Sequence, residues 1–461
     1  MSVAANRRKD VLVMKTILLM KLLEVIRELR QRQRWSRARL EAHQADALRE
    51  LRLHAYARSP FYRRFHKGLA DRPLAELPVL TKSLLMEHFD DLVTDRDIQL
   101  AGVRAYAAQP PGKLFLDRYW VTATSGSSGR PGFFLFDTPE WLTVMASFAR
   151  GQEWAGAGIN LLRRRRMATV ASVSAWHMSA QVAAAARTWW TPSQRLAASD
   201  PLDSIVQRLN ASQPHLLIAY ASMTRLLAEE QNAGRLRIRP ATVFTSSEVL
   251  TDETRRRVQQ AWGVEPLNQY AATETADIAA EYPACRHLHV FDDLVIIEVV
   301  DEHYRPVPRG MYGAKLLVTT LFSRTQPLIR YELNDSVRLA AAPCPSGLPF
   351  AVLDGIQGRE EEALSLPAMA GGRTAIQPLV FHRLMDVLPV SGWQILQAAD
   401  DGLTLLLSGA HPELVESALV NTLQQALAEH GVRAPSIEVQ RVAKIPKTAT
   451  GKAPLIRAYR P

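Results

Sequence analysis

Cysteine is scarce in this chain: two residues, Cys285 and Cys344, among 461. So few thiols exclude a disulfide framework and fit a reducing compartment. Long apolar runs are also missing. The nearest candidate, Val11 to Leu23, is interrupted by Lys15 and Lys21 and is shorter than the roughly 18–20 residues of a membrane span. No signal-peptidase site follows it. The cytoplasm is therefore the expected location, and no transmembrane segment is expected.

Several functional motifs are absent. The G-x-x-x-x-G-K-[ST] order of a P-loop does not occur, and neither does a helix-turn-helix, RNP or zinc-finger pattern. The formal charge of +10 arises in part from Arg27 to Arg39 and Arg163 to Arg166. Basic segments can face nucleic acid, anionic lipid or an anionic substrate. Without a nucleic-acid motif, a solvated arginine-rich surface is expected, with nucleotide phosphates as the specific anion.

The residues that are present indicate a globular α/β protein. Apolar residues make up 47% and charged residues 22% of a chain long enough for two or three domains. From residue 167 onward, strand-like and helix-like segments alternate, which predicts parallel sheets with helices on their faces. The expected elements are strands at 167–173, 216–219 and 242–246 and helices at 178–190, 202–210, 222–232 and 252–262. Residues 288–319 have β character, 340–349 a loop composition, and 402–442 the order strand, helix, strand.

The first sixty residues have the pattern of helix. An apolar stripe between Ile17 and Leu29 precedes a basic stretch that extends to Arg52. This segment could rest on a membrane surface, but packing against the body or a partner chain is the simpler interpretation. A break is expected at Ser59-Pro60, and Thr81 is expected to cap a following helix.

The stretch from Val121 to Leu135, VTATSGSSGRPGFFL, combines hydroxyls and glycines. Glycines bring backbone N–H groups close to a ligand, and hydroxyls add donors, so such a loop can surround polyphosphate oxygens. A solvated Ser/Gly linker has the same composition. The strand-like residues on both sides favour a tight turn between two strands.

Four later segments add to this loop. They are QYAATETAD (269–277), PLIRYELND (327–335), GREEE (358–362) and IPKTATGKAPLIR (445–457). In this order and at these distances they resemble the acyl-adenylating (AMP-forming) ligase superfamily, and more closely its phenylacetate–CoA ligase branch. AYARSPFYRRF, LPVLTK, HLHVFDDLVIIEVV and LVTTL are also similar to that branch, so the resemblance covers nearly the whole chain.

The resemblance implies an α/β fold with a large N-terminal adenylating domain of several subdomains, in which parallel α/β sheets accompany a β-rich part. A small, mobile α+β domain would follow it. The expected boundaries are 1–75 for an N-terminal helical extension, 76–357 for the adenylating domain and 358–461 for the C-terminal domain, with Glu361 as the hinge.

It also implies the residues of the site. Those expected to bind ATP are Thr124, Ser125, Gly126, Ser127, Ser128, Gly129, Ser246, Ser247, Glu248, Tyr270, Ala271, Thr273, Asp335 and Arg359. Glu274 would bind Mg²⁺, Thr273 would lie near the α-phosphate, and Lys452 would bridge the carboxylate and the α-phosphate. His177, Trp176 and Ala271 would contact the acid, with Met178 and Trp189 or Trp190 also in reach, which favours an aromatic or apolar acid.

The implied reaction uses ATP to convert a carboxylic acid to an acyl-AMP, which then passes to coenzyme A. A carrier-protein thiol or an amine is the alternative acceptor, because the segment after the hinge, ALSLPAMAGGRTAIQP, fits the family pattern poorly. A non-catalytic nucleotide-binding scaffold is disfavoured, since Glu274, Asp335 and Lys452 are all present.

Members of this branch often carry a zinc site built from Cys and His. Cys285, His289 and Cys344 could supply three ligands here, with His287 as a fourth, although Ser346 replaces a second cysteine of the later pair. Zinc binding and loss of the site both stay open, as does a homodimer. No nucleic-acid partner is expected.

Overall fold

The computed structural model describes residues 2–110, 112–124, 131–158, 164–172, 174–185, 191–359, 363–376, 378–385, 388, 390, 392–446 and 455–459; for residues 2–15, 359, 379, 382 and 383 it describes the backbone alone. Within these ranges the helices are α1 Ser2–Arg32, α2 Arg37–Arg58, α3 Pro60–Phe65, the 3₁₀ turn Leu74–Glu76, α4 Lys82–Glu87, α5 Phe89–Leu92, α6 Leu100–Ala107, α7 Thr138–Trp154, α8 Met178–Ala185, α9 Leu202–Ser212, α10 Ala221–Asn232, α11 Asp252–Trp262, α12 Pro378–Met385 and α13 Glu416–Glu429.

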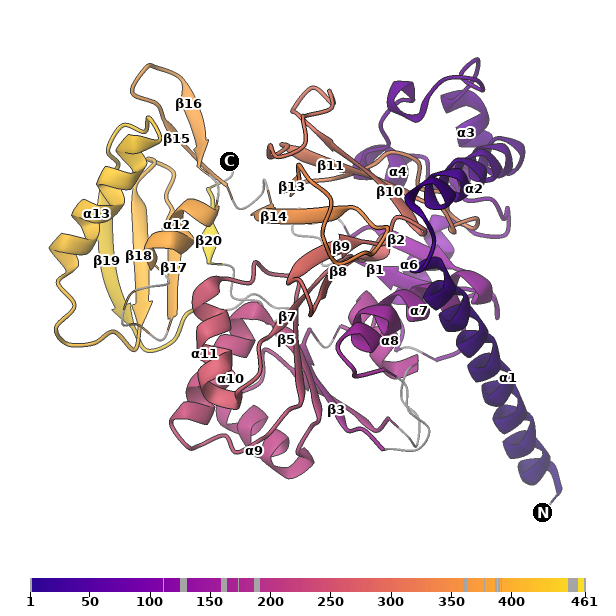
Figure 1. Ribbon diagram of the computed structural model, residues 1–461, viewed down its shortest axis with the longest axis horizontal. Coiled ribbons are helices and arrows are strands. Elements are labelled where there is room, and N and C mark those ends of the chain that lie inside the picture. Colours follow the sequence, from indigo (N-terminus) through magenta and orange to yellow (C-terminus); the bar gives the residue numbers. More distant parts are fainter. Residues whose placement is uncertain are drawn as a thin grey trace.

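The strands form one large sheet and four small ones (Figure 1). They are β1 Trp120–Ala123, β2 Phe133–Phe136, β3 Met167–Ala171, β4 Ser193–Ala197, β5 Leu216–Tyr220, β6 Thr242–Ser246, β7 Leu267–Ala272, β8 Ala276–Tyr282, β9 His287–Val290, β10 Val295–Val300, β11 Lys315–Thr320, β12 Tyr331–Leu333, β13 Asp335–Leu339, β14 Val352–Arg359, β15 Leu364–Pro367, β16 Arg373–Ile376, β17 Gly392–Gln397, β18 Leu403–Ser408, β19 Ile437–Val442 and β20 Ile456–Arg457.

The large sheet has nine strands in the order β13-β14-β9-β8-β7-β6-β5-β3-β4. From β4 to β7 neighbouring strands run parallel, and from β7 to β13 they run antiparallel. Strands β3, β5 and β6 of the parallel part lie where the sequence predicts strands, whereas β4 and β7 are not among the predicted ones. Strands β3, β5 and β6 are largely buried, as parallel strands are. The change of direction at β7 brings a tight β7–β8 turn to one edge of the parallel part.

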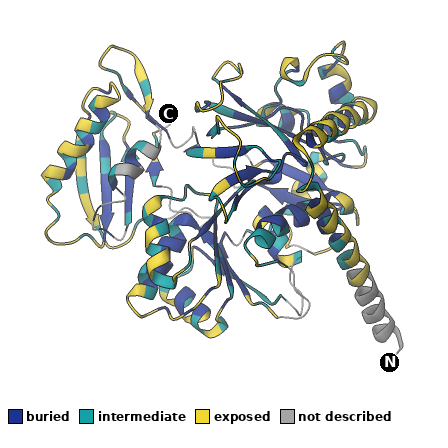
Figure 2. Cartoon of the chain, viewed as in Figure 1, coloured by how far each residue is buried: buried dark blue, intermediate teal, exposed yellow. Residues whose placement is uncertain are grey.

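The N-terminal helices lie on the body (Figures 1 and 2). Leu22, Ile26 and Leu29 of α1 are buried, and α1 packs against α7. The expectation of continuous helix is wrong in one respect, because residues 33–36 separate α1 from α2. Ser36 caps α2 through a bond from the Arg39 N–H. The expected break at Ser59 and the cap by Thr81 are both confirmed.

The C-terminal part, orange to yellow in Figure 1, has a core of its own. Trp393, Leu405 and Leu407 of the four-stranded sheet β19-β18-β17-β20 pack against Leu423 and Leu427 of α13. The expected order of strand, helix and strand is confirmed, although α13 begins at Glu416 rather than near Pro412.

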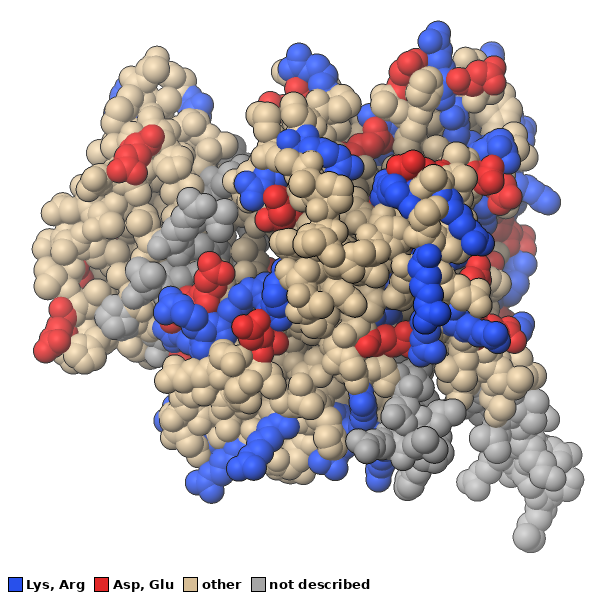
Figure 3. Space-filling model, viewed as in Figure 1, with Lys and Arg blue, Asp and Glu red and all other residues tan. Residues whose placement is uncertain are grey.

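The surface charge is mixed. On the face shown in Figure 3, lysines and arginines lie in several groups among acidic residues. Several exposed arginines of the protein are paired, as Arg37 is with Glu41 and Arg305 with Asp301. Among the described residues, no helix combines the length and apolar character that a bilayer crossing needs.

Candidate active site

A cavity of about 580 Å³ opens at the C-terminal ends of β6 and β7, the edge at which parallel sheets bind ligands. Five of the residues expected to bind ATP line it: Ser247, Glu248, Tyr270, Ala271 and Asp335. They come from segments up to 88 positions apart in sequence (335 − 247). The fold therefore brings together residues that the motifs indicated separately.

Tyr270 and Asp335 are joined directly. The Tyr270 hydroxyl donates a hydrogen bond to Oδ2 of Asp335 at 2.8 Å. Asp335 opens β13 and lies opposite Arg359, the last residue of β14, in the antiparallel ladder. Asp335 and Arg359, which are both expected to bind ATP, are therefore neighbours across the two strands. Asp335 is buried, and an ionised carboxylate offers two acceptor oxygens.

The segment after β6 forms another wall of the cavity. Ser247 has a positive φ of 67°, an uncommon conformation for serine that recurs at functional sites. Oε2 of Glu248 accepts a bond from the Ser222 N–H at 2.8 Å, so this carboxylate also satisfies the first turn of α10. Ser246 ends β6 and lies outside the cavity lining.

The hydroxyl- and glycine-rich stretch lies between two paired strands. β1 and β2 are antiparallel, and Thr124 and Gly132 close the base of the hairpin through two bonds. The Thr124 N–H donates to the Gly132 carbonyl at 3.0 Å, and the Gly132 N–H donates to the Thr124 hydroxyl at 2.8 Å. The strands on both sides of the stretch are therefore paired with each other. Ser125, Gly126, Ser127, Ser128 and Gly129 lie outside the described residues.

The segment expected to contact the acid lies beside this hairpin. The Ala123 N–H donates to the Trp176 carbonyl at 2.7 Å, next to Thr124. The Trp176 ring is half-buried and packs against Tyr106 with ring centroids 5.0 Å apart. His177 is half-buried at the start of α8, and Met178 is buried. Trp189 and Trp190 lie outside the described residues.

Thr273 and Glu274 lie in the β7–β8 turn, three and four residues after Tyr270 and beyond the lining of the cavity. Both are half-buried. Glu361 and Lys452 fall outside the described residues, and of Arg359 the backbone alone is described.

Glu281 is a site residue that the motifs do not indicate. Its buried carboxylate lies in the cavity wall and pairs with Arg255 at 2.9 Å and Arg286 at 2.8 Å. It also accepts from the Asn268 N–H at 2.9 Å. A glutamate directly after the apolar residues 278–280 of β8 was the available sequence signal, because a buried charge requires partners.

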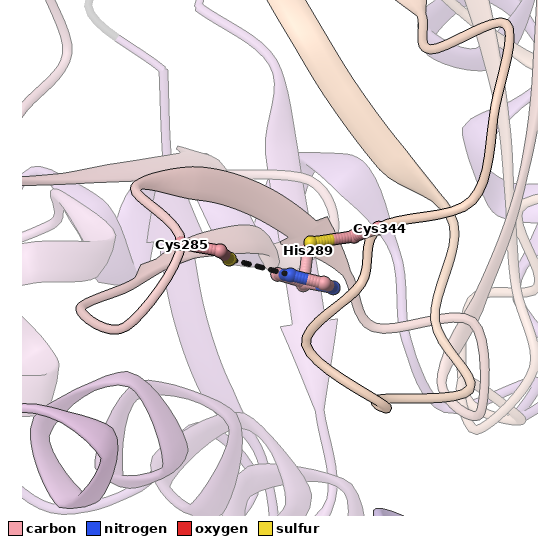
Figure 4. A group of neighbouring side chains, drawn as sticks. All are labelled: Cys285, His289 and Cys344. Atoms are coloured by element: carbon pink, nitrogen blue, oxygen red, sulfur yellow. Dashed lines mark hydrogen bonds between the residues drawn. The ribbon is translucent and has the colours of Figure 1, made fainter.

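Cys285, His289 and Cys344 form a cluster in which the ligand atoms all lie within 4.8 Å of one another (Figure 4). Cys285 Sγ is 3.3 Å from His289 Nε2, and Cys344 Sγ is 3.4 Å from His287 Nδ1. Burial and the neighbouring His287 lower the pKa of His289 to about 4. Burial opposes ionisation of Cys344, but hydrogen bonds from His287 and Ser346 lower the pKa of its thiol to about 7.

Comparison with known proteins gives consistent matches. The phenylacetate–coenzyme A ligase of Thermus thermophilus is 23% identical over 370 residues, covering 77% of each chain. A 2-hydroxyisobutyryl-CoA ligase in its postadenylation state has a TM-score of 0.70 at 21% identity and covers 93% of this chain and 91% of its own. In its thioesterification state, that ligase has a TM-score of 0.57 at 20% identity, over 92% and 91%. No family model matches the chain.

The fold is therefore that of the acyl-adenylating ligases. The resemblance to their phenylacetate–CoA ligase branch, stated above from the sequence motifs, is confirmed.

Proposed function

We propose that this protein activates a carboxylic acid with ATP to give an acyl-AMP and pyrophosphate, and then transfers the acyl group to coenzyme A. The observation that carries the proposal is the Tyr270–Asp335 pair, which faces a nucleotide-sized cavity at the ligand-binding edge of the sheet. The similarity to phenylacetate–coenzyme A ligase over 77% of the chain supports it.

In the first step a carboxylate oxygen attacks the α-phosphorus of ATP, the bond between the α- and β-phosphates breaks, and pyrophosphate leaves. Tyr270 would stack on adenine while Asp335 and Arg359 bind the ribose. The loop from Thr124 to Gly129 would hold the β- and γ-phosphates, and Thr273 would lie near the α-phosphate. Glu274 is the proposed Mg²⁺ ligand, a hard oxygen donor that suits this ion, which would screen phosphate charge.

In the second step the thiol sulfur of coenzyme A attacks the acyl carbon, and AMP leaves. We propose the domain division 1–75, 76–357 and 358–461, with rotation about Glu361 between the two steps. The separate core of the C-terminal part supports the boundary at 358. Lys452 would stabilise the charge that develops in the first step.

The acid is proposed to be aromatic or apolar. Trp176 and His177 lie beside the base of the phosphate loop, and Trp176 packs on Tyr106. Their mixed aromatic character suits a flat or apolar acyl group. The cytoplasm is the proposed location, in keeping with two unpaired cysteines.

ATP–pyrophosphate exchange with a panel of aromatic and aliphatic acids tests the first step, and product analysis with coenzyme A, amines or a carrier protein tests the second. We expect exchange and a thioester. A lack of exchange with every acid would reject adenylation, and exchange without a thioester would favour another acceptor. Lys452→Ala is expected to lose exchange by more than about a hundredfold, as the loss of charge stabilisation predicts.

We also propose a structural zinc site at Cys285, His289 and Cys344, with His287 as the fourth ligand. Two thiols and two imidazoles are a common donor set for tetrahedral zinc. The neutral state of His289 at pH 7 suits coordination. Such a site would tie the loop between β13 and β14 to the β8–β9 hairpin. Elemental analysis should find about one zinc per chain, and none in Cys285→Ser; metal-free wild-type protein would reject the site.

A further inference from the structure

Two arginines of the body reach the same backbone carbonyl of the C-terminal part. Nη2 of Arg225, on α10, donates to the Val390 oxygen at 3.0 Å, and Nη2 of Arg257, on α11, lies 3.5 Å from it. Val390 is buried and lies two residues before the strand β17, which carries Trp393, the largest side chain of the C-terminal core. A bond to this carbonyl therefore restrains the C-terminal part close to its core.

Both arginines are held firmly on the body side. Glu229 lies between them, 3.5 Å from Nε of Arg225 and paired with Nη1 of Arg257. Glu253 pairs with Nε of Arg257 at 2.6 Å. The two guanidinium groups are largely buried, with exposures of 7% and 18%. In this arrangement, ion pairs on the body side accompany the contact of both guanidinium groups with Val390.

A cavity of about 910 Å³ separates the two parts around this contact. Its lining includes Arg225 and Arg257 from the body and Val390, Trp393 and Ile445 from the C-terminal part. The two parts are not tightly packed here, so the hydrogen bonds to Val390 form a localised polar contact between them.

The contact with Val390 holds the C-terminal part in one arrangement relative to the body. This arrangement is relevant to the first step of the proposed reaction, the activation of the acid, which we call the first half-reaction. Lys444 and Ile445, and Leu455 and Ile456, lie on either side of the lysine segment in sequence, and all four line the interdomain cavity. This cavity shares Glu248, Val249 and Thr251 with the nucleotide cavity. The described residues on both sides of the lysine segment therefore line a cavity that adjoins the nucleotide cavity in this arrangement.

We propose that Arg225 and Arg257 are positioning residues that latch the C-terminal part in the arrangement for acid activation and release Val390 before acyl transfer. The inference rests on the proposed function for the identity of the two half-reactions. It assigns a role to two arginines that lie outside the lining of the nucleotide cavity.

The test is Arg225→Lys, which keeps the charge beside Glu229 but cannot form the forked contact. We expect kcat of acid-dependent ATP–pyrophosphate exchange to fall about three- to tenfold, the worth of roughly one hydrogen bond. The KM for ATP and thioester formation from supplied acyl-AMP should stay unchanged. Small-angle X-ray scattering should show a wider distribution of distances. The matched control is Arg235→Lys, which lines the same cavity and pairs with Glu230 on the body alone.

Scattering and exchange identical to those of wild type and Arg235→Lys would overturn the latch. If Arg225→Lys does not fold by circular dichroism, Arg257→Lys takes its place under the same criteria. Absence of exchange in the wild-type protein contradicts the proposed function alone, and the scattering of Arg225→Lys then decides whether the latch exists.

Discussion

At the scale of single residues, the Tyr270–Asp335 pair makes the sharpest prediction. In the proposed site, Asp335→Asn removes a charged acceptor for the ribose hydroxyls, and such bonds are worth about 1.5–3 kcal/mol. We expect the KM for ATP in the exchange assay to rise roughly ten- to hundredfold. Tyr270→Phe removes one hydroxyl but keeps the ring, so the rise should stay below about tenfold. Equal effects of the two substitutions would contradict these roles.

The residues of this pair were predictable, but their contact was not. Each stands in a motif that the resemblance made recognisable, and each was assigned its own part of the nucleotide. Their hydrogen bond joins positions 65 apart, and it depends on the antiparallel strands that follow β7. Glu281 was missed for the same reason, because its partners Arg255 and Arg286 come from α11 and from the β8–β9 turn.

At the scale of elements, the start of α7 is bonded to a segment far away in sequence through a buried glutamate. Glu140 forms a capping box with Asp137 and accepts bonds from the backbone N–H groups of Arg324 and Thr325, 184 and 185 positions away. These donors favour the carboxylate. Burial outweighs them and, together with the neighbouring Asp137, raises the pKa of Glu140 from 4.5 to about 7.

This pKa predicts a pH dependence of stability. Between pH 4.5 and 7 the folded state keeps a proton that the unfolded chain releases, so the contribution of Glu140 is full below pH 4.5 and is lost as the pH rises through 7. Urea unfolding at pH 5 to 8 should show a flatter profile for Glu140→Gln than for wild type. Glu413→Gln, at an exposed site, should follow wild type. An unchanged slope in Glu140→Gln would show that another group titrates.

Element boundaries were predictable where local signals agree. Strand β6 and helix α11 were predicted to the residue. Thr251 caps α11, and Gly263 ends it at a φ of 69°. The N-terminal helices were less predictable, since the turn at residues 33–36 and its partners are set by the body. His43 and Gln44 bond to the backbone at Asp293 and Asp292, about 250 positions away.

The docking of α1 also depends on a buried ion pair. Arg150 of α7 forms two bonds of 2.7 Å to Asp293 and lies over the rings of Phe291 and Phe350, close to the Leu29 carbonyl. Arg150→Met leaves Asp293 buried with much of its charge uncompensated, so unfolding by urea should show a loss of about 3–5 kcal/mol. Arg150→Met with Asp293→Leu should lose less than the two single changes together, and strict additivity would contradict the coupling.

At the scale of the whole molecule, the body and the C-terminal part each have their own hydrophobic core, and the two meet around a cavity. The chain passes from one part to the other through residues 359–363. The resemblance carried in part by the motif GREEE implied a junction at residue 358, and the separate core of the C-terminal part is in keeping with it. The relative arrangement of the two parts could not be predicted from any local sequence pattern. It depends on contacts such as Arg225 to Val390, which join positions 165 apart.

The proposed hinge makes the two half-reactions separable. Proline fixes φ near −65° and removes an N–H donor, so Glu361→Pro should restrict rotation between the parts. We expect ATP–pyrophosphate exchange to stay within about threefold of wild type, while thioester formation from supplied acyl-AMP falls more than about tenfold, since rotation gates that step. Glu361→Ala, which keeps backbone freedom, should retain both rates. If Glu361→Pro lowers both rates equally, or neither, the hinge lies at another residue of the junction. The double variant Glu361→Pro with Arg225→Lys should exchange faster than Arg225→Lys alone and approach the rate of Glu361→Pro alone. A chain restricted at the hinge no longer needs the contact of Arg225 with Val390 to hold the two parts in place.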